Sequence, residues 1–260
     1  MLAVWLPHRR VATIASFSVL DGNIDHFVPK RPEWNVDHAR QLVEAKCRES
    51  PDGGLWGVVH NAETVRDVFV DEWTRVEDYE KVMATNFTGH VRITHAFRDL
   101  LLLAGGRVVF CSGAAGLVAH ATMGPYAASK FAIRAYADVL RCELWRLGVS
   151  VCTVFPGYHL TPLRDYEMRS REMFQRWQSL PPQTHQRYPY SVVHKMAISL
   201  RQLPMWLGGD GTAVVEAYSH ALTARFPLPH YYVGLDTAFL WRPLQLLHAH
   251  IHACIFAWLA

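Results

Sequence analysis

The sequence predicts an α/β fold, with a mostly parallel sheet and helices on both faces. From residue 55 onward, short apolar stretches of strand length alternate with longer segments whose apolar residues recur at helical spacing. Turn-forming residues end several of these segments, at Gly105-Gly106, Gly148 and Pro156-Gly157. The resulting order of strand, helix, strand, helix and strand corresponds to two successive βαβ units, which close right-handed.

The elements follow one another at regular intervals. Apolar stretches predict strands at 55–60 (LWGVVH), 107–111 (RVVFC), 149–155 (VSVCTVF) and, more briefly, 231–234. Helical spacing predicts helices at 78–104, 126–147 and 214–224. We expect one domain over 1–260, because this length suits a single large domain.

Three segments depart from the alternation. Residues 1–35 form an atypical N-terminal segment: one strand is expected within 11–20, but no glycine-rich turn follows it. Residues 163–208 carry charges, aromatic residues and Pro181-Pro182, and we expect a helical flap that faces the substrate. Residues 236–260 form an apolar C-terminal segment.

Composition excludes some classes of function. Half of the residues are hydrophobic, 19% are charged and the formal net charge is +3, without a basic block, so nucleic-acid binding is not expected. Nine Trp and twelve Phe are compatible with an apolar ligand cavity, a membrane-facing surface or an aromatic-rich core. Five scattered cysteines without a C-x-x-C pair indicate buried thiols in a reducing compartment.

Both termini carry apolar stretches that bear on targeting, membrane contact and metal binding. The short apolar stretch before Arg9 and Arg10 predicts no signal peptide, and no run of about 18 apolar residues predicts a spanning helix. The apolar stretch 241–260 could lie in a membrane interface. Within it, the three histidines of 248–252 would not share one helix face, and no acidic partner is evident, so no metal site is expected.

The residues that carry chemistry are Tyr126 and Lys130, in the stretch YAASK. At positions i and i+4 they lie on one face of a helix, one turn apart. A phenol with a pKa near 10 is a poor acid or base at neutral pH, but an adjacent ammonium favours the phenolate. The same ammonium can donate hydrogen bonds to the hydroxyls of a ribose. The pair therefore predicts general acid/base chemistry at Tyr126, although Y-x-x-x-K alone is a weak motif.

Four further motifs accompany the pair in a fixed order. They are 60–63 (HNAE), 86–89 (NFTG), 112–116 (SGAAG) and Pro156-Gly157, with Thr161 beyond it. With these motifs, 55–163 resembles the short-chain dehydrogenase/reductase family, and in particular the branch that holds D-β-hydroxybutyrate, retinol and 17β-hydroxysteroid dehydrogenases. The similarity covers roughly 200 residues in all. It implies a Rossmann-like fold.

The resemblance implies a catalytic set. Tyr126 would be the general acid/base at the substrate oxygen, and Lys130 would assist it and hold the nicotinamide ribose. Asn86 would hold a water molecule in a proton relay, and Ser112 is the candidate for the family's serine. In this branch, however, the serine usually stands three residues before the loop glycine. The loop glycine here is Gly116, so the expected serine position is occupied by Gly113.

The resemblance also implies a binding set for NAD or NADP. Asn61 would hold the adenosine side, while Pro156, Gly157 and Thr161 would line the nicotinamide pocket. Two departures bear on this set. The family's first strand, glycine-rich turn and first helix are not recognisable, so the fold is expected to be N-terminally truncated and to lack a pyrophosphate cradle. Glu63 replaces a glycine and brings a carboxylate near an anionic cofactor.

Two functions from different classes follow. The first is an NAD(P)-dependent oxidoreductase that interconverts an alcohol and its carbonyl, with a hydroxybutyrate-, steroid- or retinoid-like substrate. The second is a non-catalytic relative or truncated product that serves as a binding or oligomerisation scaffold. By resemblance we further expect a homo-oligomer and an intracellular, membrane-associated protein in mitochondria or endoplasmic reticulum. Peripheral membrane contact would use 236–260, while the choice between NAD and NADP cannot be read.

Overall fold

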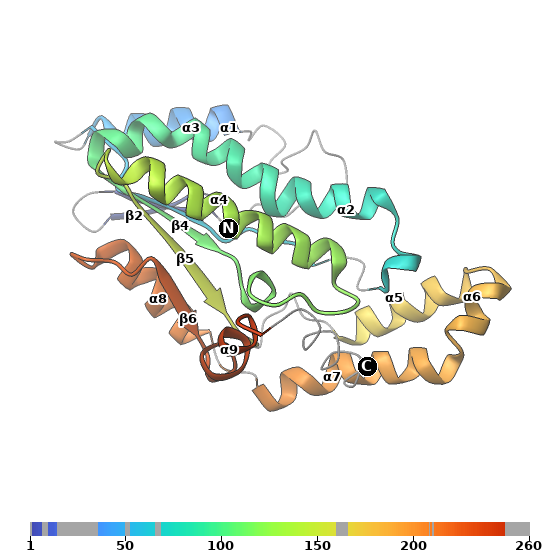
Figure 1. Cartoon of the computed structure of the whole chain (residues 1–260). Helices are drawn as coiled ribbons and strands as arrows, with labels where there is room; N and C mark the ends of the chain where they lie inside the picture. Colours follow the sequence, from blue (N-terminus) through green and yellow to red (C-terminus); the bar gives the residue numbers. More distant parts are fainter. Residues whose placement is uncertain are drawn as a thin grey trace.

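The computed structural model describes residues 2–6, 10–14, 36–49, 53–65, 69–159, 166–207, 209 and 211–247. Its centre is a six-stranded sheet in the order β2-β1-β3-β4-β5-β6 (Figure 1). The strands are β1 (Leu2–Leu6), β2 (Arg10–Ile14), β3 (Gly57–His60), β4 (Arg107–Cys111), β5 (Ser150–Pro156) and β6 (His230–Val233). Strands β3 to β6 pair in parallel, which confirms the mostly parallel sheet.

An antiparallel hairpin extends the sheet beyond β3. Strand β1 pairs antiparallel with β2 and also with β3, where Leu2 lies opposite His60. The strand expected within 11–20 is therefore found as β2, while β1 was not predicted from the sequence. The position beside β3 in the sheet is thus filled by a strand of opposite direction to the parallel strands.

Three long helices cover one face of the sheet: α1 (Val36–Cys47), α3 (Gly89–Ala104) and α4 (Gly124–Trp145), as Figure 1 shows. Their apolar stripes pack on the strands, with Phe97 and Ile133 fully buried against Val108. Local sequence signals set the ends of these helices. Pro125 lies in the first turn of α4, where its missing N–H costs no hydrogen bond. Gly105 ends α3 in the left-handed conformation, with φ 55°.

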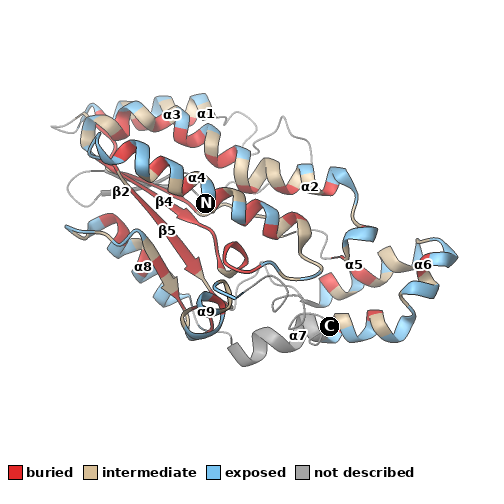
Figure 2. Cartoon of the chain, in the orientation of Figure 1, coloured by how far each residue is buried: buried red, intermediate tan, exposed pale blue. Residues whose placement is uncertain are grey.

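Helix α8 (Thr212–Thr223) covers the other face, so helices lie on both faces as predicted. Ala217 and Ala221 pack on the sheet, and Arg107 donates a hydrogen bond to the Ala221 carbonyl at 2.9 Å. Figure 2 shows strands β4 and β5 buried along most of their length between the two layers. After β6 the described chain continues through a π-helical turn (Thr237–Trp241) and the short α9 (Arg242–Leu244).

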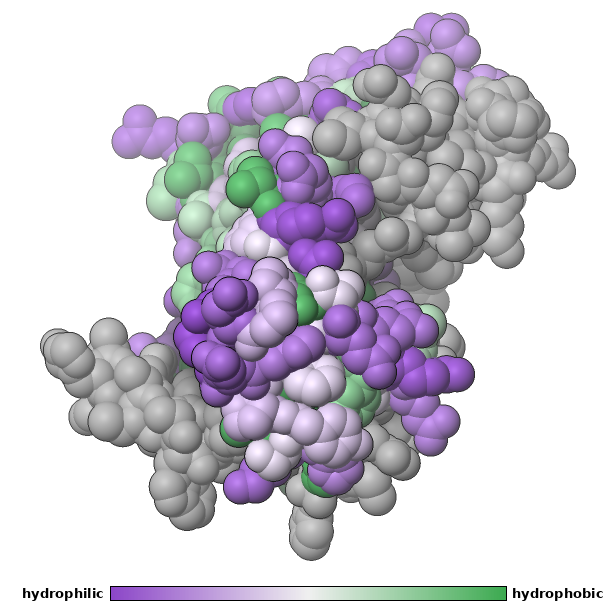
Figure 3. All heavy atoms as spheres, turned by 90° about the vertical axis from the view of Figure 1, so that its right-hand side faces the viewer, coloured by the Kyte–Doolittle hydropathy of each residue, from purple (hydrophilic) through white to green (hydrophobic). Residues whose placement is uncertain are grey.

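The segment predicted as a flap is helical, and comprises α5 (Tyr166–Gln178), α6 (Pro182–Arg187) and α7 (Tyr190–Leu207). Met173 and Val193 pack against Trp73, which lies in the short turn Asp71–Trp73 before α2 (Val76–Met83). Figure 3 views the molecule from the flap side and shows a described surface that is largely hydrophilic, with scattered apolar side chains. Among the described flap residues, Met173, Val193 and Ala197 are buried in a cluster separate from the main core. Its role toward a substrate stays a prediction.

No helix among the described residues combines the length and the apolar character needed to cross a bilayer.

Candidate active site

The candidate site lies at the carboxyl ends of the parallel strands, where α/β folds of this type bind their ligands. Glu63 comes three residues after the end of β3, and Ser112 directly follows β4. Tyr126 and Lys130 lie in the first two turns of α4, with the Lys130 ammonium 5.4 Å from the centre of the Tyr126 ring. The structure therefore brings the predicted catalytic pair together at the expected edge of the sheet.

One carboxylate oxygen contacts both members of this pair. Oε2 of Glu63 accepts a hydrogen bond from the Tyr126 hydroxyl at 3.2 Å and forms an ion pair with the Lys130 ammonium. The ammonium also donates to the Cys111 carbonyl at 3.0 Å. Burial alone would lower the pKa of Lys130, which is 1% exposed, but the Glu63 carboxylate outweighs that effect and holds the pKa above its ordinary value. Lys130 is therefore a buried, charged and paired ammonium.

Asn86 lies beside the pair, on a π-helical turn (Ala84–Thr88) between α2 and α3. Such turns occur often at functional sites. The side-chain amide of Asn86 forms two hydrogen bonds with the backbone of Thr64: its oxygen accepts from the Thr64 N–H at 2.8 Å, and its nitrogen donates to the Thr64 carbonyl at 3.0 Å. The same nitrogen also donates to the Ser129 hydroxyl. Asn86 thus fastens the segment after β3 to the helix layer, and its part in a proton relay stays a prediction.

The hydroxyl of Ser112 points into the protein. It donates a hydrogen bond to the backbone carbonyl of Lys130 at 2.9 Å, and the residue is fully buried. The position facing the phenol of Tyr126 is Gly113, where a Cβ would lie 3.8 Å from the hydroxyl. Gly113 has φ +72°, a conformation that favours glycine over serine. In this geometry Ser112 holds the backbone of α4, and its catalytic role stays a prediction.

The packing of Ser112 gives a direct test of that orientation. A Cβ on Gly116 would lie 1.9 Å from the Ser112 hydroxyl oxygen and 3.0 Å from the Lys130 carbonyl. We expect Gly116→Ala to lower the free energy of unfolding by about 2 kcal/mol through overpacking. The double variant with Ser112→Ala should be less destabilised than the sum of the two single variants, because the nearest obstacle is gone. Urea unfolding of all four proteins measures this coupling, and strictly additive losses would place the hydroxyl elsewhere.

The predicted cofactor-binding residues have structural partners of their own. Asn61 accepts a hydrogen bond from the Tyr218 hydroxyl at 2.5 Å, which links the end of β3 to α8. Pro156 ends β5, and the next residue, Gly157, lies so close to Asp236 that a Cβ would be 2.0 Å from its Oδ1. Gly157 is therefore required by packing, whatever its role toward a ligand. Thr161 lies outside the described residues.

A buried histidine pair, which was not predicted from the sequence, lies next to the site. The rings of His60, at the end of β3, and His90, on α3, lie 5.0 Å apart, and both residues are at most 2% exposed. Nε2 of His60 lies 3.0 Å from the Thr94 hydroxyl, and Nε2 of His90 lies 2.8 Å from the Ala62 carbonyl. The feature of the sequence that could have pointed to this pair is His60 of the HNAE motif, because the family motif that it resembles begins with asparagine. His90 follows NFTG directly but belongs to no motif.

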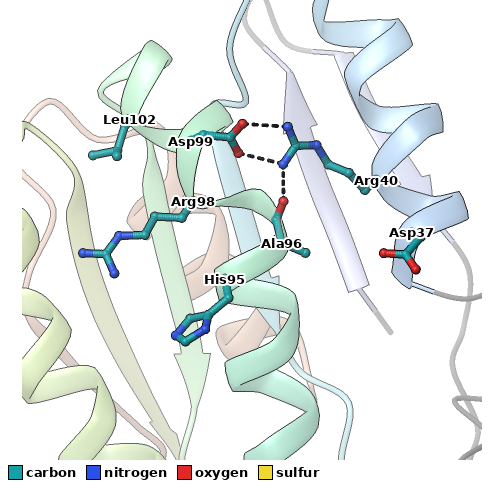
Figure 4. Close-up of a pocket in the computed structure, with 7 residues that line it drawn as sticks. All are labelled: Asp37, Arg40, His95, Ala96, Arg98, Asp99 and Leu102. Carbon is teal, nitrogen blue, oxygen red and sulfur yellow. Dashed lines mark hydrogen bonds and ion pairs between the residues drawn. The ribbon is translucent and has the colours of Figure 1, made fainter.

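A separate open pocket of about 530 Å³ lies on the outer side of α3, between this helix and α1 (Figure 4). Arg40 crosses it and pairs with the Asp99 carboxylate through two hydrogen bonds of 2.7 Å. His95 and Arg98 line the same pocket. The pocket does not include Tyr126 or any other residue of the candidate site, so we assign it no part in the chemistry.

The parallel sheet with helices on both faces, and a Tyr–Lys pair at its carboxyl edge, defines a Rossmann-like protein. The family model for short chain dehydrogenases matches residues 34–172, and the chain belongs to this family. Retinol dehydrogenase 5 of Homo sapiens is 32% identical over 225 residues, which cover 86% of this chain and 70% of that protein. The mitochondrial D-beta-hydroxybutyrate dehydrogenase of Bos taurus is 34% identical over 202 residues, covering 76% and 58%. The branch expected from the motifs is confirmed.

A solved short chain dehydrogenase from Mycobacterium paratuberculosis, described as bound to NAD, has the same fold. It superimposes with a TM-score of 0.55 at 23% identity, over 73% of this chain and 65% of that one. The chain therefore spans about two thirds of the length of these relatives, between 58% and 70%.

Proposed function

We propose that this protein is an NAD(P)-dependent oxidoreductase that interconverts an alcohol and its carbonyl. One observation carries the proposal: the Tyr126 hydroxyl and the Lys130 ammonium converge on one point, the Oε2 atom of Glu63, at the carboxyl edge of the sheet. A phenol that donates and accepts, next to an ammonium with three donors, is a donor set that fits the hydroxyls of a ribose once Glu63 is displaced. Family membership agrees with this reading.

The chemistry assigns a separate task to each residue. When bound, a nicotinamide accepts or supplies the hydride. In oxidation, the C–H and O–H bonds of the alcohol break, the carbon loses a hydride and Tyr126, as phenolate, takes the hydroxyl proton, which leaves a carbonyl. Lys130 would hold the ribose and favour the phenolate, while Asn61, Pro156, Gly157 and Thr161 would line the cofactor site. In reduction, Tyr126 returns the proton to the oxygen.

The substrate class remains part of the proposal. The relatives are described as retinol and hydroxybutyrate dehydrogenases, which makes retinoid- and hydroxybutyrate-like alcohols candidates. Steroid-like alcohols are a third candidate, from the resemblance of the motifs. A homo-oligomer, peripheral membrane contact through 236–260 and a mitochondrial or endoplasmic-reticulum compartment likewise stay proposals. One of the two relatives is described as mitochondrial.

A second candidate function, a non-catalytic scaffold of the same family, is favoured by two observations. Glu63 engages both residues of the catalytic pair, and glycine rather than serine faces the Tyr126 hydroxyl. Such a protein would keep the fold for its surface and would not turn over a substrate.

Nucleotide binding separates the two candidates. We expect NADH or NADPH to bind with a Kd at or below about 1 mM, equivalent to roughly 4 kcal/mol, measured by nucleotide fluorescence and energy transfer from tryptophan. Lys130→Met should weaken binding, whereas Lys46→Met, at an exposed lysine on α1, serves as the matched control. Circular dichroism checks that each variant is folded. If neither the folded wild type nor Glu63→Ala, which removes the carboxylate from the pair, binds either nucleotide, the oxidoreductase proposal fails. The scaffold function then remains.

A further inference from the structure

The contact between Glu63 and the catalytic pair is unusual because a single flexible side chain meets both reactive groups. Glu63 is 21% exposed in its side chain, whereas Lys130, which it covers, is 1% exposed. Solvent reaches part of the Glu63 side chain, whereas the Lys130 side chain is almost fully shielded. The carboxylate is thus positioned between Lys130 and the outside of the protein.

The charges explain why Glu63 stays there. A buried ammonium loses its hydration, and the Cys111 carbonyl at 3.0 Å is an uncharged acceptor. A carboxylate compensates the charge fully, and the two groups attract strongly where water is largely excluded. The Tyr126 hydroxyl adds a third contact to the same oxygen at 3.2 Å. Glu63 therefore supplies the kind of oxygen acceptors that a ribose diol would supply, together with a negative charge.

We propose that Glu63 is an intramolecular occupant of the cofactor site, which keeps the Tyr126–Lys130 pair closed until the side chain is displaced. This inference rests on the proposed function, since it concerns the same pair of residues. In the closed state the carboxylate takes both groups that would hold the ribose. It also offsets the ammonium charge that would stabilise a phenolate at Tyr126.

The occupant sets the affinity of the site by a simple relation. A ligand that binds only the open state has an apparent Kd equal to the intrinsic Kd divided by the open fraction, so a site open about 10% of the time binds about tenfold more weakly. Removing the Glu63 carboxylate should therefore restore the nucleotide affinity that the closed state costs. A glutamine at position 63 keeps the size of the side chain but not its charge, so it separates electrostatic closure from steric closure.

The test compares wild type with Glu63→Ala, Glu63→Gln and the control Glu77→Ala, which removes an exposed glutamate from the first turn of α2. We expect NADH and NADPH to bind Glu63→Ala at least about tenfold more tightly than wild type. Glu63→Gln should give an intermediate gain, and Glu77→Ala none. Binding is followed by fluorescence, on proteins shown to be folded by circular dichroism.

A second readout needs no nucleotide. Reductive methylation with formaldehyde and cyanoborohydride, followed by mass spectrometry, reports how accessible each lysine is. Lys130 should be methylated faster in Glu63→Ala than in wild type, while Lys46 reacts equally in both. Faster methylation without nucleotide binding by any variant shows that Glu63 covers Lys130, but it ends the oxidoreductase proposal and with it the occupancy of a cofactor site. Equal methylation of Lys130, with wild type binding nucleotide as tightly as Glu63→Ala, overturns the occupant and leaves the oxidoreductase proposal standing.

Discussion

Replacing Tyr126 by phenylalanine is expected to lower kcat/KM for alcohol oxidation by about 10²- to 10⁴-fold, the contribution typical of a positioned general acid or base. The change removes one hydroxyl, whose described partner is Glu63 at 3.2 Å, so the fold should be retained. The assay uses hydroxybutyrate, steroid and retinol substrates with both nucleotides. It should be run in wild type and in the Glu63→Ala background, where the pair is free to act.

A matched tyrosine provides the control for this experiment. Tyr231, on β6, accepts a hydrogen bond at its hydroxyl from the backbone N of Leu228 at 2.9 Å and faces the α8 side of the sheet. The same hydroxyl lies 2.9 Å from Nδ1 of His220, so Tyr231→Phe should lower stability by about 2 kcal/mol through two lost hydrogen bonds and leave kcat/KM unchanged. A Tyr126→Phe protein that kept more than half of the activity would remove Tyr126 from the proton-transfer role.

Acidification is expected to destabilise the protein between pH 6.5 and about 4, through the histidine pair behind the site. Burial, with a smaller effect from the charge of Lys130, lowers the pKa of His90 to about 4. Burial also lowers the pKa of His60 well below its ordinary value, and the neighbouring His90 adds to this effect. In the unfolded chain both imidazoles take up a proton near pH 6.5, whereas in the folded protein they stay neutral.

The sign of the effect follows from proton uptake. Because the unfolded state binds more protons over this range, the free energy of unfolding falls as the pH drops below 6.5. The fall due to His90 ends near pH 4, where the folded state also takes up its proton, and amounts to about 3 kcal/mol. His60 adds to it in the same direction.

Urea unfolding at intervals from pH 7.5 to 4 measures this dependence. His90→Gln should flatten the profile, since glutamine can still donate to the Ala62 carbonyl but does not titrate. His95→Gln, at an exposed histidine on the same helix, is the matched control and should follow the wild-type profile. If His90→Gln loses stability as steeply as wild type, the acid response originates elsewhere in the protein.

Much of the fold could be predicted from the sequence because the parallel strands are buried on both faces. The stretch RVVFC corresponds to β4 without error in its bounds, and β3, β5 and β6 begin and end within two residues of expectation. Continuous apolar runs between glycines and prolines mark such strands clearly. Helix α1 was missed, although Ala39, Val43 and Cys47 recur at four-residue spacing.

The site was predictable as a set of residues but not as a set of contacts. The spacing of Tyr126 and Lys130 on one helix face is a local property, so their proximity could be read directly. Glu63 stands out in the sequence as a departure from glycine, but its contact with a helix more than sixty residues later depends on how the sheet and α4 pack. The orientation of Ser112 and the positive φ of Gly113 are likewise set by the loop backbone, which the motif spacing does not encode.

The hairpin of β1 and β2 has a consequence for the behaviour of this protein in solution. All four residues of β3 are buried, and this strand is hydrogen-bonded to β4 on one side and to β1 on the other. Without β1, β3 would be the open edge of an apolar, parallel part of the sheet, and its unpaired N–H and C=O groups could pair with a strand of another chain. The hairpin occupies that edge. The pairing of β1 with β3 therefore moves the open edge of the sheet from the fully buried β3 to β2.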